Sequence, residues 1–293
     1  MSIYEQLLQF LIAGISMGSI YAIVGLGFMI VYSVTRVINF AQGEFVMLGG
    51  MLTTVFYKAG LPLFISILCA AVITSAIGLF LHRSVIYPIR KAPVFTLILV
   101  TFGASIAIRG LGLIFWGTDP RILPPFSKGE AIHLGGAVVN IQALWVIGIT
   151  GLMAITLFLF FERTVPGKAF RASSINVLGA SLMGIRTGTM GSLAFMLAAL
   201  LGSLAGAVLT PMMTTSYDVG LALSVKGFVA AIIGGLNKIE GILVGGLALG
   251  ILEAYGAGLI HSGFKDVIPL LIFLVVLKIR GGGLVGGAEA GKV

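Results

Sequence analysis

The chain has 293 residues, of which 58% are apolar and 10% are charged, with a net charge of +8 and a mean hydropathy of +1.14. A water-soluble domain carries about 25% charged residues and a disordered chain has low hydrophobicity, so this composition excludes both classes. The basic residues are scattered rather than clustered, which argues against binding of nucleic acid, and we predict an all-α polytopic transmembrane helical bundle.

Eight apolar runs follow one another along the chain, and a helix needs about 20 apolar residues to cross a bilayer. The runs cover residues 7–34, 37–57, 62–81, 93–116, 141–161, 188–212, 225–260 and 264–279. Three polar stretches, 82–91, 117–140 and 162–187, separate them clearly. Together the runs predict a single transmembrane domain over residues 1–293.

Basic residues are distributed unevenly over the connecting segments. Ten of the 18 Lys and Arg residues lie in 82–91, in 162–187 and in the C-terminal tail, whereas four lie in the alternate connections. Cytoplasmic loops of membrane proteins are enriched in Lys and Arg, so we expect these three segments on the cytoplasmic side. The N-terminus is then expected outside, and the C-terminus in the cytoplasm.

Two of the apolar runs are interrupted by polar and glycine residues. The first interruption reads Asn39-x-x-x-Gly43 and the second reads Asn237-x-x-x-Gly241, and a pair of glycines follows each. Gly-interrupted hydrophobic segments in both halves of a transporter point to its pathway, so we predict broken or re-entrant helices here. The alternative is a chance similarity in a chain with 42 glycines.

Ionisable residues inside a membrane are costly and each requires an explanation. Glu44 lies in the first interruption, Lys238 and Glu240 lie in the second, and Glu253 lies within an apolar run. They either line a polar pathway or pair with backbone amides and with each other. For Lys238 and Glu240 a solvated cytoplasmic turn explains the charges equally well, whereas Glu44 favours a polar helix break near a pathway. Arg36 is expected to reach the cytoplasmic side.

Small residues recur at a spacing of four, which lets helices approach closely in lipid. The stripes are Gly14, Gly18 and Ala22; Gly202 and Gly206; and Gly246, Gly250 and Ala254. We interpret them as packing surfaces. For Gly14 and Gly18 the alternative is a contact with a partner subunit.

The polar stretch 162–187 is predicted to hold a short helix from Lys168 to Met183. Pro166-Gly167 ends the preceding span, and Gly184 can end the helix. A helix presented between two spans on the cytoplasmic face suits contact with a motor protein. A plain amphipathic helix at the membrane interface is the alternative.

Signals of catalysis are absent from the sequence. Its three histidines lie in separate connections without metal-ligand spacing, and Gly167-Lys168-Ala169 lacks the hydroxyl and the upstream glycine of a phosphate-binding loop. We therefore expect neither an enzyme nor a cofactor in this chain. If ATP drives it, a different chain must bind the ATP and Mg²⁺.

Three motifs resemble one known family, the LivH-type permeases of ATP-binding-cassette (ABC) importers for branched-chain amino acids. The first is Gly18-Ser-Ile-Tyr-Ala22 followed by Arg36 to Phe45, the second runs from Gly167 to Ile185, and the third runs from Lys226 to Gly246. They occur in the order of that family, and the resemblance covers roughly residues 5–285.

This resemblance implies a permease that works by alternating access in the bacterial inner membrane. Expected partners are a second, LivM-type permease, two cytoplasmic ATPase subunits, a periplasmic solute-binding protein and membrane lipid; whether the permease pair is a heterodimer or a homodimer stays open. The ATPase-coupling positions it implies are Gly167, Lys168, Ala169, Arg171, Ala172, Asn176, Ala180, Gly184 and Ile185. The pathway positions it implies are Asn39, Gln42, Gly43, Glu44, Asn237 and Gly241.

Alternative functions also fit the sequence. Sister permeases for urea, short amides or aromatic acids share the same landmarks, so the motifs support the transporter class better than the solute. A stand-alone channel or secondary carrier also uses broken helices and buried charge. A lipid-processing membrane enzyme is a distant third possibility because the chain shows no nucleophile paired with a base.

Overall fold

The computed structural model describes residues 2–127 and 129–279 and is almost entirely helical. The long helices are α1 (Ile3–Thr35), α3 (Leu63–Leu81), α4 (Val94–Trp116), α5 (Ile141–Arg163), α8 (Thr187–Leu209) and α10 (Ile239–Leu259). The shorter ones are α2 (Gln42–Lys58), α6 (Val165–Ile175), α7 (Val177–Leu182), α9 (Val219–Gly234) and α11 (Phe264–Ile279). Among the described residues, six helices are long and apolar enough to cross a membrane, α3 being counted with the π-helical turn His82–Ile86 that extends it. The predicted helical membrane bundle is confirmed.

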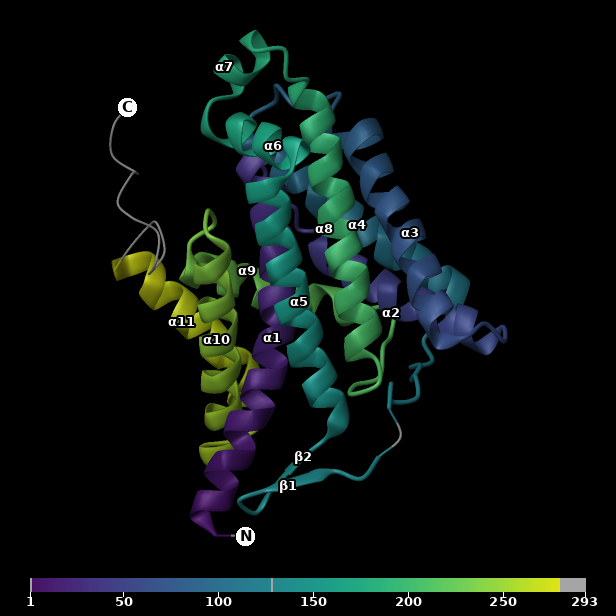
Figure 1. Ribbon diagram of the computed structural model, residues 1–293, viewed down its shortest axis with the longest axis vertical. Helices are drawn as coiled ribbons and strands as arrows, with labels where there is room; N and C mark the ends of the chain where they lie inside the picture. Colours follow the sequence, from purple (N-terminus) through teal and green to yellow (C-terminus); the bar gives the residue numbers. More distant parts are fainter. Residues whose placement is uncertain (1, 128, 280–293) are drawn as a thin grey trace.

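The connections separate to the two ends of the bundle. Figure 1 shows α6 and α7 at one end, the α6–α7 end, and the N-terminus at the opposite end. A short hairpin of β1 (Ile132–Leu134) and β2 (Ala137–Val139) lies near the N-terminus, and the Gln9 side chain exchanges two hydrogen bonds with the backbone of Val138. The basic residues Lys128, Arg280 and Lys292, which entered the charge count, lie outside the described residues.

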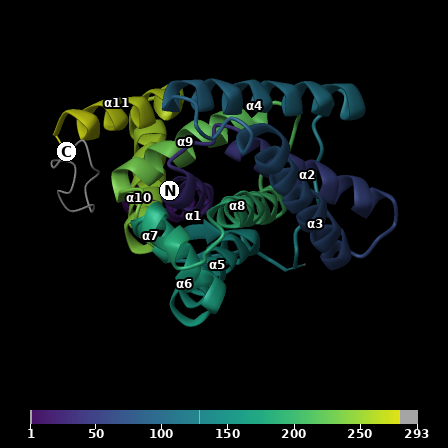
Figure 2. The same cartoon turned by 90° about the horizontal axis from the view of Figure 1, so that it is seen from above.

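Helices α1 and α8 form the centre of the molecule. Seen from above, α4 and α11 lie along one edge, and α5 and α6 lie toward the opposite one (Figure 2). Helix α1 packs on α9 and α10, and α8 packs on α2 and α3. Both central helices therefore contact a short helix and the spanning helix that follows it.

Glycines make these helix contacts possible. A Cβ added at Gly18 would lie 2.7 Å from the Gly246 carbonyl oxygen, and one added at Gly206 would lie 1.9 Å from that of Val46. The predicted packing role of the small-residue stripes is confirmed. Because Gly14 and Gly18 face α10, the alternative in which they contact a partner subunit is wrong.

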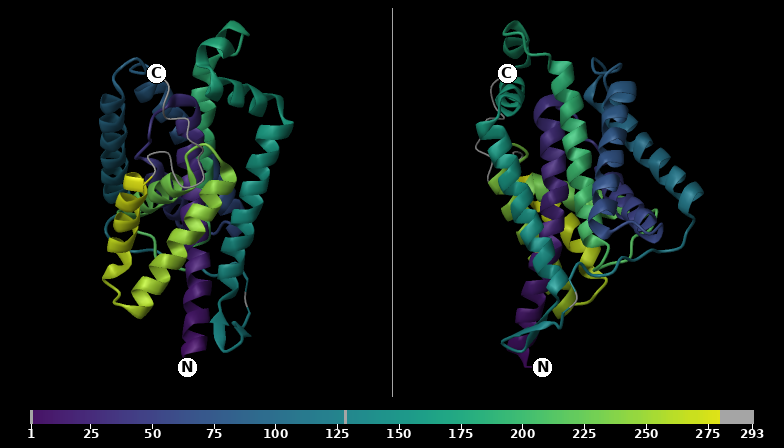
Figure 3. Two further views of the ribbon diagram at one scale, coloured as in Figure 1. Left: turned by 90° about the vertical axis from the view of Figure 1, so that its left-hand side faces the viewer. Right: turned by 45° about the vertical axis from the view of Figure 1, so that its right-hand side comes forward.

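Helix α4 packs loosely compared with the others. In the right-hand view of Figure 3 it leans away from the rest of the bundle. A groove of about 590 Å³ with apolar walls, among them Leu52, Ile77 and Ala104, lies between α2, α3 and α4. Most of the outward surface of α4 is apolar, including Phe95, Ile114 and Phe115, as expected for a lipid-facing span.

Both interrupted runs are broken in the structure. Residues 36–41 are not helical, and α2 begins only at Gln42. The run 225–260 divides into α9 and the spanning helix α10, which a turn at 235–238 joins. At 1.5 Å per residue the 16 residues of α9 extend ~24 Å, less than a full crossing. Its start at Val219 lies upstream of the predicted run.

Candidate functional site: a buried helix break and an exposed helical tip

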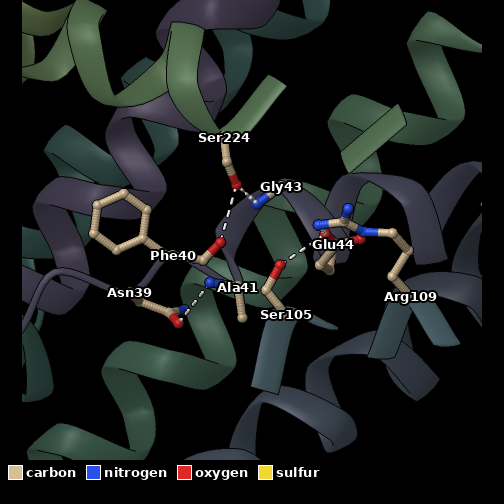
Figure 4. A network of polar contacts seen from close by, with 8 residues as sticks. All are labelled: Asn39, Phe40, Ala41, Gly43, Glu44, Ser105, Arg109 and Ser224. Atoms are coloured by element: carbon tan, nitrogen blue, oxygen red, sulfur yellow. Dashed lines mark hydrogen bonds and ion pairs between the residues drawn. The ribbon is translucent and has the colours of Figure 1, made fainter. Parts of the chain in front are cut away.

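The break between α1 and α2 lies inside the bundle. Asn39 and Ala41 are fully buried, although backbone without helical hydrogen bonds is tolerated at membrane depth only where the protein supplies partners. The Ser224 hydroxyl accepts a hydrogen bond from the Gly43 N–H (2.7 Å) and donates one to the Phe40 carbonyl (3.1 Å). Figure 4 shows this hydroxyl, from α9, bridging the break. A single side chain thus joins α9 to the start of α2.

Two further side chains satisfy the backbone of the break. The Thr101 hydroxyl accepts from the Phe40 N–H (3.3 Å) and lies 3.2 Å from the Ile38 carbonyl oxygen. The Asn39 side-chain oxygen accepts from the Ala41 N–H (3.2 Å). The break is therefore a built structure, held by residues of α4 and α9 as well as its own.

Glu44 is a buried carboxylate in the first turn of α2. The Ser105 hydroxyl donates to its Oε1 at 2.8 Å, and Arg109 Nη2 lies 3.3 Å from the same oxygen. Both partners come from α4, and the positive end of the α2 dipole also favours the negative charge. Gly220 of α9 leaves room for the second oxygen, since a Cβ there would lie 2.4 Å from Oε2.

A second charged cluster lies among α9, α10 and α11. Lys226 Nζ lies 2.9 Å from Glu253 Oε1, and Lys265 Nζ lies 3.8 Å from the same oxygen. Glu253 and Lys226 are both buried. The predicted explanation by mutual pairing holds for Glu253, whereas Lys238 and Glu240 are exposed at the turn between α9 and α10.

Aromatic rings surround the exposed side of the break. The Phe40 ring contacts those of Phe28, Phe102 and Phe228, with centroids 5.5–6.5 Å apart. Phe28 is buried, Phe40 and Phe228 are half-buried, and Phe102 is 42% exposed. The break thus reaches the protein surface between α4 and α9 through an aromatic lining.

The predicted pathway residues fall into two separate groups. Asn39, Gln42, Gly43 and Glu44 lie together in the break; Gln42 donates to the Ala198 carbonyl (3.0 Å), and Gly43 lies against Gly220. Asn237 is exposed and Gly241 packs on Gly234 in the α9–α10 turn. The similarity between the two sequence interruptions is therefore not a similarity of place, because Asn39 precedes the short helix α2 and Asn237 precedes the spanning helix α10.

The segment 162–187 forms two helices, not the single helix predicted from Lys168 to Met183. The Thr164 hydroxyl caps α6 by accepting from the Gly167 N–H (3.0 Å), and Pro166 lies in the first turn. Asn176 ends α6 and caps α7, its side-chain oxygen accepting from the Gly179 N–H (2.8 Å). Gly184, with φ of +83°, follows α7 and ends it as predicted.

The predicted coupling residues differ in their exposure. Lys168, Arg171, Asn176 and Gly184 are exposed; Ala169, Ala172 and Ile185 are half-buried; Gly167 and Ala180 are buried. A Cβ at Gly167 would lie 2.0 Å from the Phe160 carbonyl oxygen, so this glycine seats α6 on the end of α5. Gly167 and Ala180 therefore serve the packing of the segment, and the accessible members are the ones that can contact another protein directly.

The tip of this segment presents apolar side chains to solvent. Figure 1 shows α7 projecting from the end of the bundle. The exposed fractions are 84% for Ile175, 71% for Leu178, 80% for Leu182 and 84% for Met183. A cluster of large apolar side chains at a polar loop marks a protein or membrane contact.

Several residues of these two sites could not be identified from the sequence. Ser105 and Arg109 lie in an apolar run and Ser224 lies directly before one, and only the packing of α4 and α9 against α2 reveals their role. The sequence signal that could have identified them is the presence of isolated polar residues within or beside apolar runs, since such residues in a membrane segment need polar partners. Ile175 and Met183 carried no signal of their own.

The family model and the relatives most similar in sequence indicate one family. The family model described as "Branched-chain amino acid transport system / permease component" matches residues 10–277. The permease protein LivH of the high-affinity branched-chain amino acid transport system of Escherichia coli is 30% identical, covering 99% of both chains. The corresponding BraD of Pseudomonas aeruginosa is 30% identical, covering 98% of both. The solved structure of PsaBC from Streptococcus pneumoniae in complex with Fab covers 94% of both chains at 14% identity, with a TM-score of 0.49.

Proposed function

The chain belongs to the family of branched-chain amino acid transport permeases, and from this premise we propose that it carries branched-chain amino acids through the inner membrane as one subunit of an ABC importer. The α6–α7 tip, which exposes large apolar side chains at a connection between two spans, is the observation that carries the mechanism. Such a surface needs a partner.

That partner is an ATPase. The exposed residues Lys168, Arg171 and Asn176 border the apolar tip, so the surface combines an apolar centre with a polar rim, as protein interfaces do. The close packing of Gly167 on α5 and the Glu162–Arg171 ion pair attach α6 to the bundle. This attachment is needed if a movement of the ATPase is to be transmitted to the spanning helices. ATP and Mg²⁺ are used by two such ATPase subunits, and this chain holds no cofactor.

The solute passes along the face where the helix break reaches the surface. Phe40, Phe102 and Phe228 offer apolar rings, and the same helix break leads into α2 with its Glu44–Arg109 pair. This mixture suits a zwitterion with an aliphatic side chain. The second, LivM-type permease closes this face, and a periplasmic binding protein delivers the solute at the N-terminal end of the bundle.

The family match favours branched-chain amino acids over the sister solutes, urea, short amides and aromatic acids. A panel of amino acids and amides tested by thermal shift on the partner binding protein checks the solute. We expect leucine, isoleucine or valine to stabilise it most. If an amide alone stabilises the binding protein, the chain would still be a permease of this class, but its solute would be an amide.

Uptake of labelled leucine into vesicles that contain all five components tests the proposed function. We expect uptake to need ATP and the ATPases to co-purify with the chain. A chain that purifies alone and transports leucine without ATP would be a channel or secondary carrier instead. The double variant Gly167→Val/Arg171→Ala, which unseats α6 and removes its ion pair, should lose solute-stimulated ATP hydrolysis and uptake together.

A further inference from the structure

Arg36 joins α6 to the start of the buried helix break. Its Nη2 donates a hydrogen bond of 2.7 Å to the carbonyl oxygen of Ser174, near the end of α6. Arg36 is also the first residue after α1, and the segment 37–41, in which Val37, Asn39 and Ala41 are buried, follows it directly. This hydrogen bond therefore connects α6 with the segment between α1 and α2.

The backbone of Arg36 fixes the direction in which that chain continues. Its φ is +56°, the sole positive value among the non-glycine residues that the structure describes. This left-handed conformation is unfavourable for a residue with a Cβ, and the Arg36 N–H still donates to the Tyr32 carbonyl (2.9 Å). Arg36 therefore ends α1 and turns the chain inward, so a displacement of its side chain is passed to the break.

Helix α6 and the end of α5 are packed together and can deliver such a displacement as one unit. The ring centroids of Phe170 and of Phe161, at the end of α5, lie 5.1 Å apart. Gly167 packs against the Phe160 carbonyl. The carbonyl of Ser174 belongs to the last turn of this helix. A push on α6 thus acts on Arg36 through a short, charge-assisted hydrogen bond.

The space around Arg36 allows this movement. A cavity of about 700 Å³ lies between α1, α6 and the α9–α10 turn, and Arg36, Arg171, Ser174, Lys238 and Glu240 line it. Helix α6 can therefore shift relative to the α9–α10 turn without a clash of packed side chains. Both partners of the Arg36–Ser174 hydrogen bond line this cavity.

We propose that Arg36 is the positioning residue that transmits movement of α6 to the helix break at 37–41 and to the start of α2. The proposal rests on the proposed function, since it takes α6–α7 as the ATPase contact. It adds a route from that contact to the pathway, through the side chain and the left-handed backbone of one residue.

The test uses the complete reconstituted importer with Arg36→Ala, Arg36→Gln and Arg36→Lys. For Arg36→Ala we expect normal assembly and retained ATP hydrolysis. We expect the amount of solute taken up per ATP to fall about 10-fold or more, because a fold-change of that size corresponds to the loss of a hydrogen bond from a charged group. Arg36→Lys, which can still donate to the Ser174 carbonyl, should recover part of the coupling. Lys238→Ala removes a cation from the same cavity without touching the chain between α1 and α2, and should couple normally.

A reporter in the break separates transmission from stability. Cys69 is the single cysteine of the chain. With Cys69→Ser as background, Phe40→Cys is labelled with a maleimide in the ATP-free and vanadate-trapped importer. We expect the labelling rate to change between the two states when Arg36 is present, and to stay constant with Arg36→Ala.

Two results for Arg36→Ala would overturn the proposal: a parallel loss of ATP hydrolysis and uptake, or normal uptake per ATP. Failure of both Arg36→Ala and Arg36→Gln to assemble would also overturn it, because it would indicate a purely structural role. Failure of the proposed function is distinguishable, because the importer with Arg36 intact would then show no ATP-dependent uptake.

Discussion

Gly43 has no side chain, and this allows α2 and α9 to approach closely beside the helix break. Its Cα faces the Gly220 carbonyl oxygen so closely that an added Cβ would lie 1.9 Å from it. Since the obstacle is backbone, the helices α2 and α9 would have to separate.

We predict that Gly43→Ala destabilises the protein by about 1–3 kcal/mol, the usual cost of overpacking, and lowers uptake. Thermal unfolding in detergent measures the change. The control is Gly103→Ala on α4, where an added Cβ meets nothing within 4 Å. Equal melting temperatures for the two variants would contradict the role given to the α2–α9 contact.

The Glu44–Arg109 pair gives a second prediction at this scale. Arg109→Ala removes the cation beside the buried carboxylate and leaves the Ser105 hydroxyl and the α2 dipole. Breaking a buried pair by removing one partner costs about 3–5 kcal/mol. We expect the double variant Glu44→Gln/Arg109→Ala to recover a large part of that loss, because no uncompensated charge remains. Thermal unfolding of both single variants and the double variant measures this coupling. Additive effects would show that Arg109 acts independently of Glu44.

At the scale of elements, the division of α6 from α7 depends on Asn176. It caps α7 through the Gly179 N–H, and replacing an N-cap Asn by Ala costs about 1 kcal/mol. We predict that Asn176→Ala weakens ATPase binding while Asn176→Asp, which keeps the acceptor, does not. Co-purification of the ATPases in increasing salt measures the difference. Identical retention of ATPase by both variants would contradict a role of α7 in docking.

Some elements were predictable from sequence and others were not. A break near 39–44 was predictable because polar residues interrupt an apolar run, although in the structure it covers 36–41 and α2 already begins at Gln42. The end of α7 was predictable because Gly184 follows it. The division at Asn176 was not predicted, although Asn is a strong N-cap, because small and apolar residues continue on both sides. The location of Asn237 away from Asn39 was not predictable either, since local motifs carry no information on which helices pack together.

At the scale of the whole molecule, the predicted orientation requires the two basic loops to lie at one end of the bundle. The basic loops 82–91 and 162–187 belong to one end of the bundle, opposite the N-terminus. We predict that, in a Cys69→Ser background, Ser181→Cys on α7 is labelled from the cytoplasm and Thr118→Cys from the outside. Labelling of intact cells with a membrane-impermeant maleimide measures this. The reverse pattern would invert the orientation.

The pairing of α1 with α10 has a consequence for biogenesis. The glycine stripe of α1 packs on a helix that is synthesised almost last, so during translation Gly14 and Gly18 face lipid or an insertase. A chain that stops after α8 would leave α1 without its main partner, and membrane quality-control proteases should recognise it. Pulse-chase decay of chains truncated before and after α10 would show whether closing this contact completes the fold.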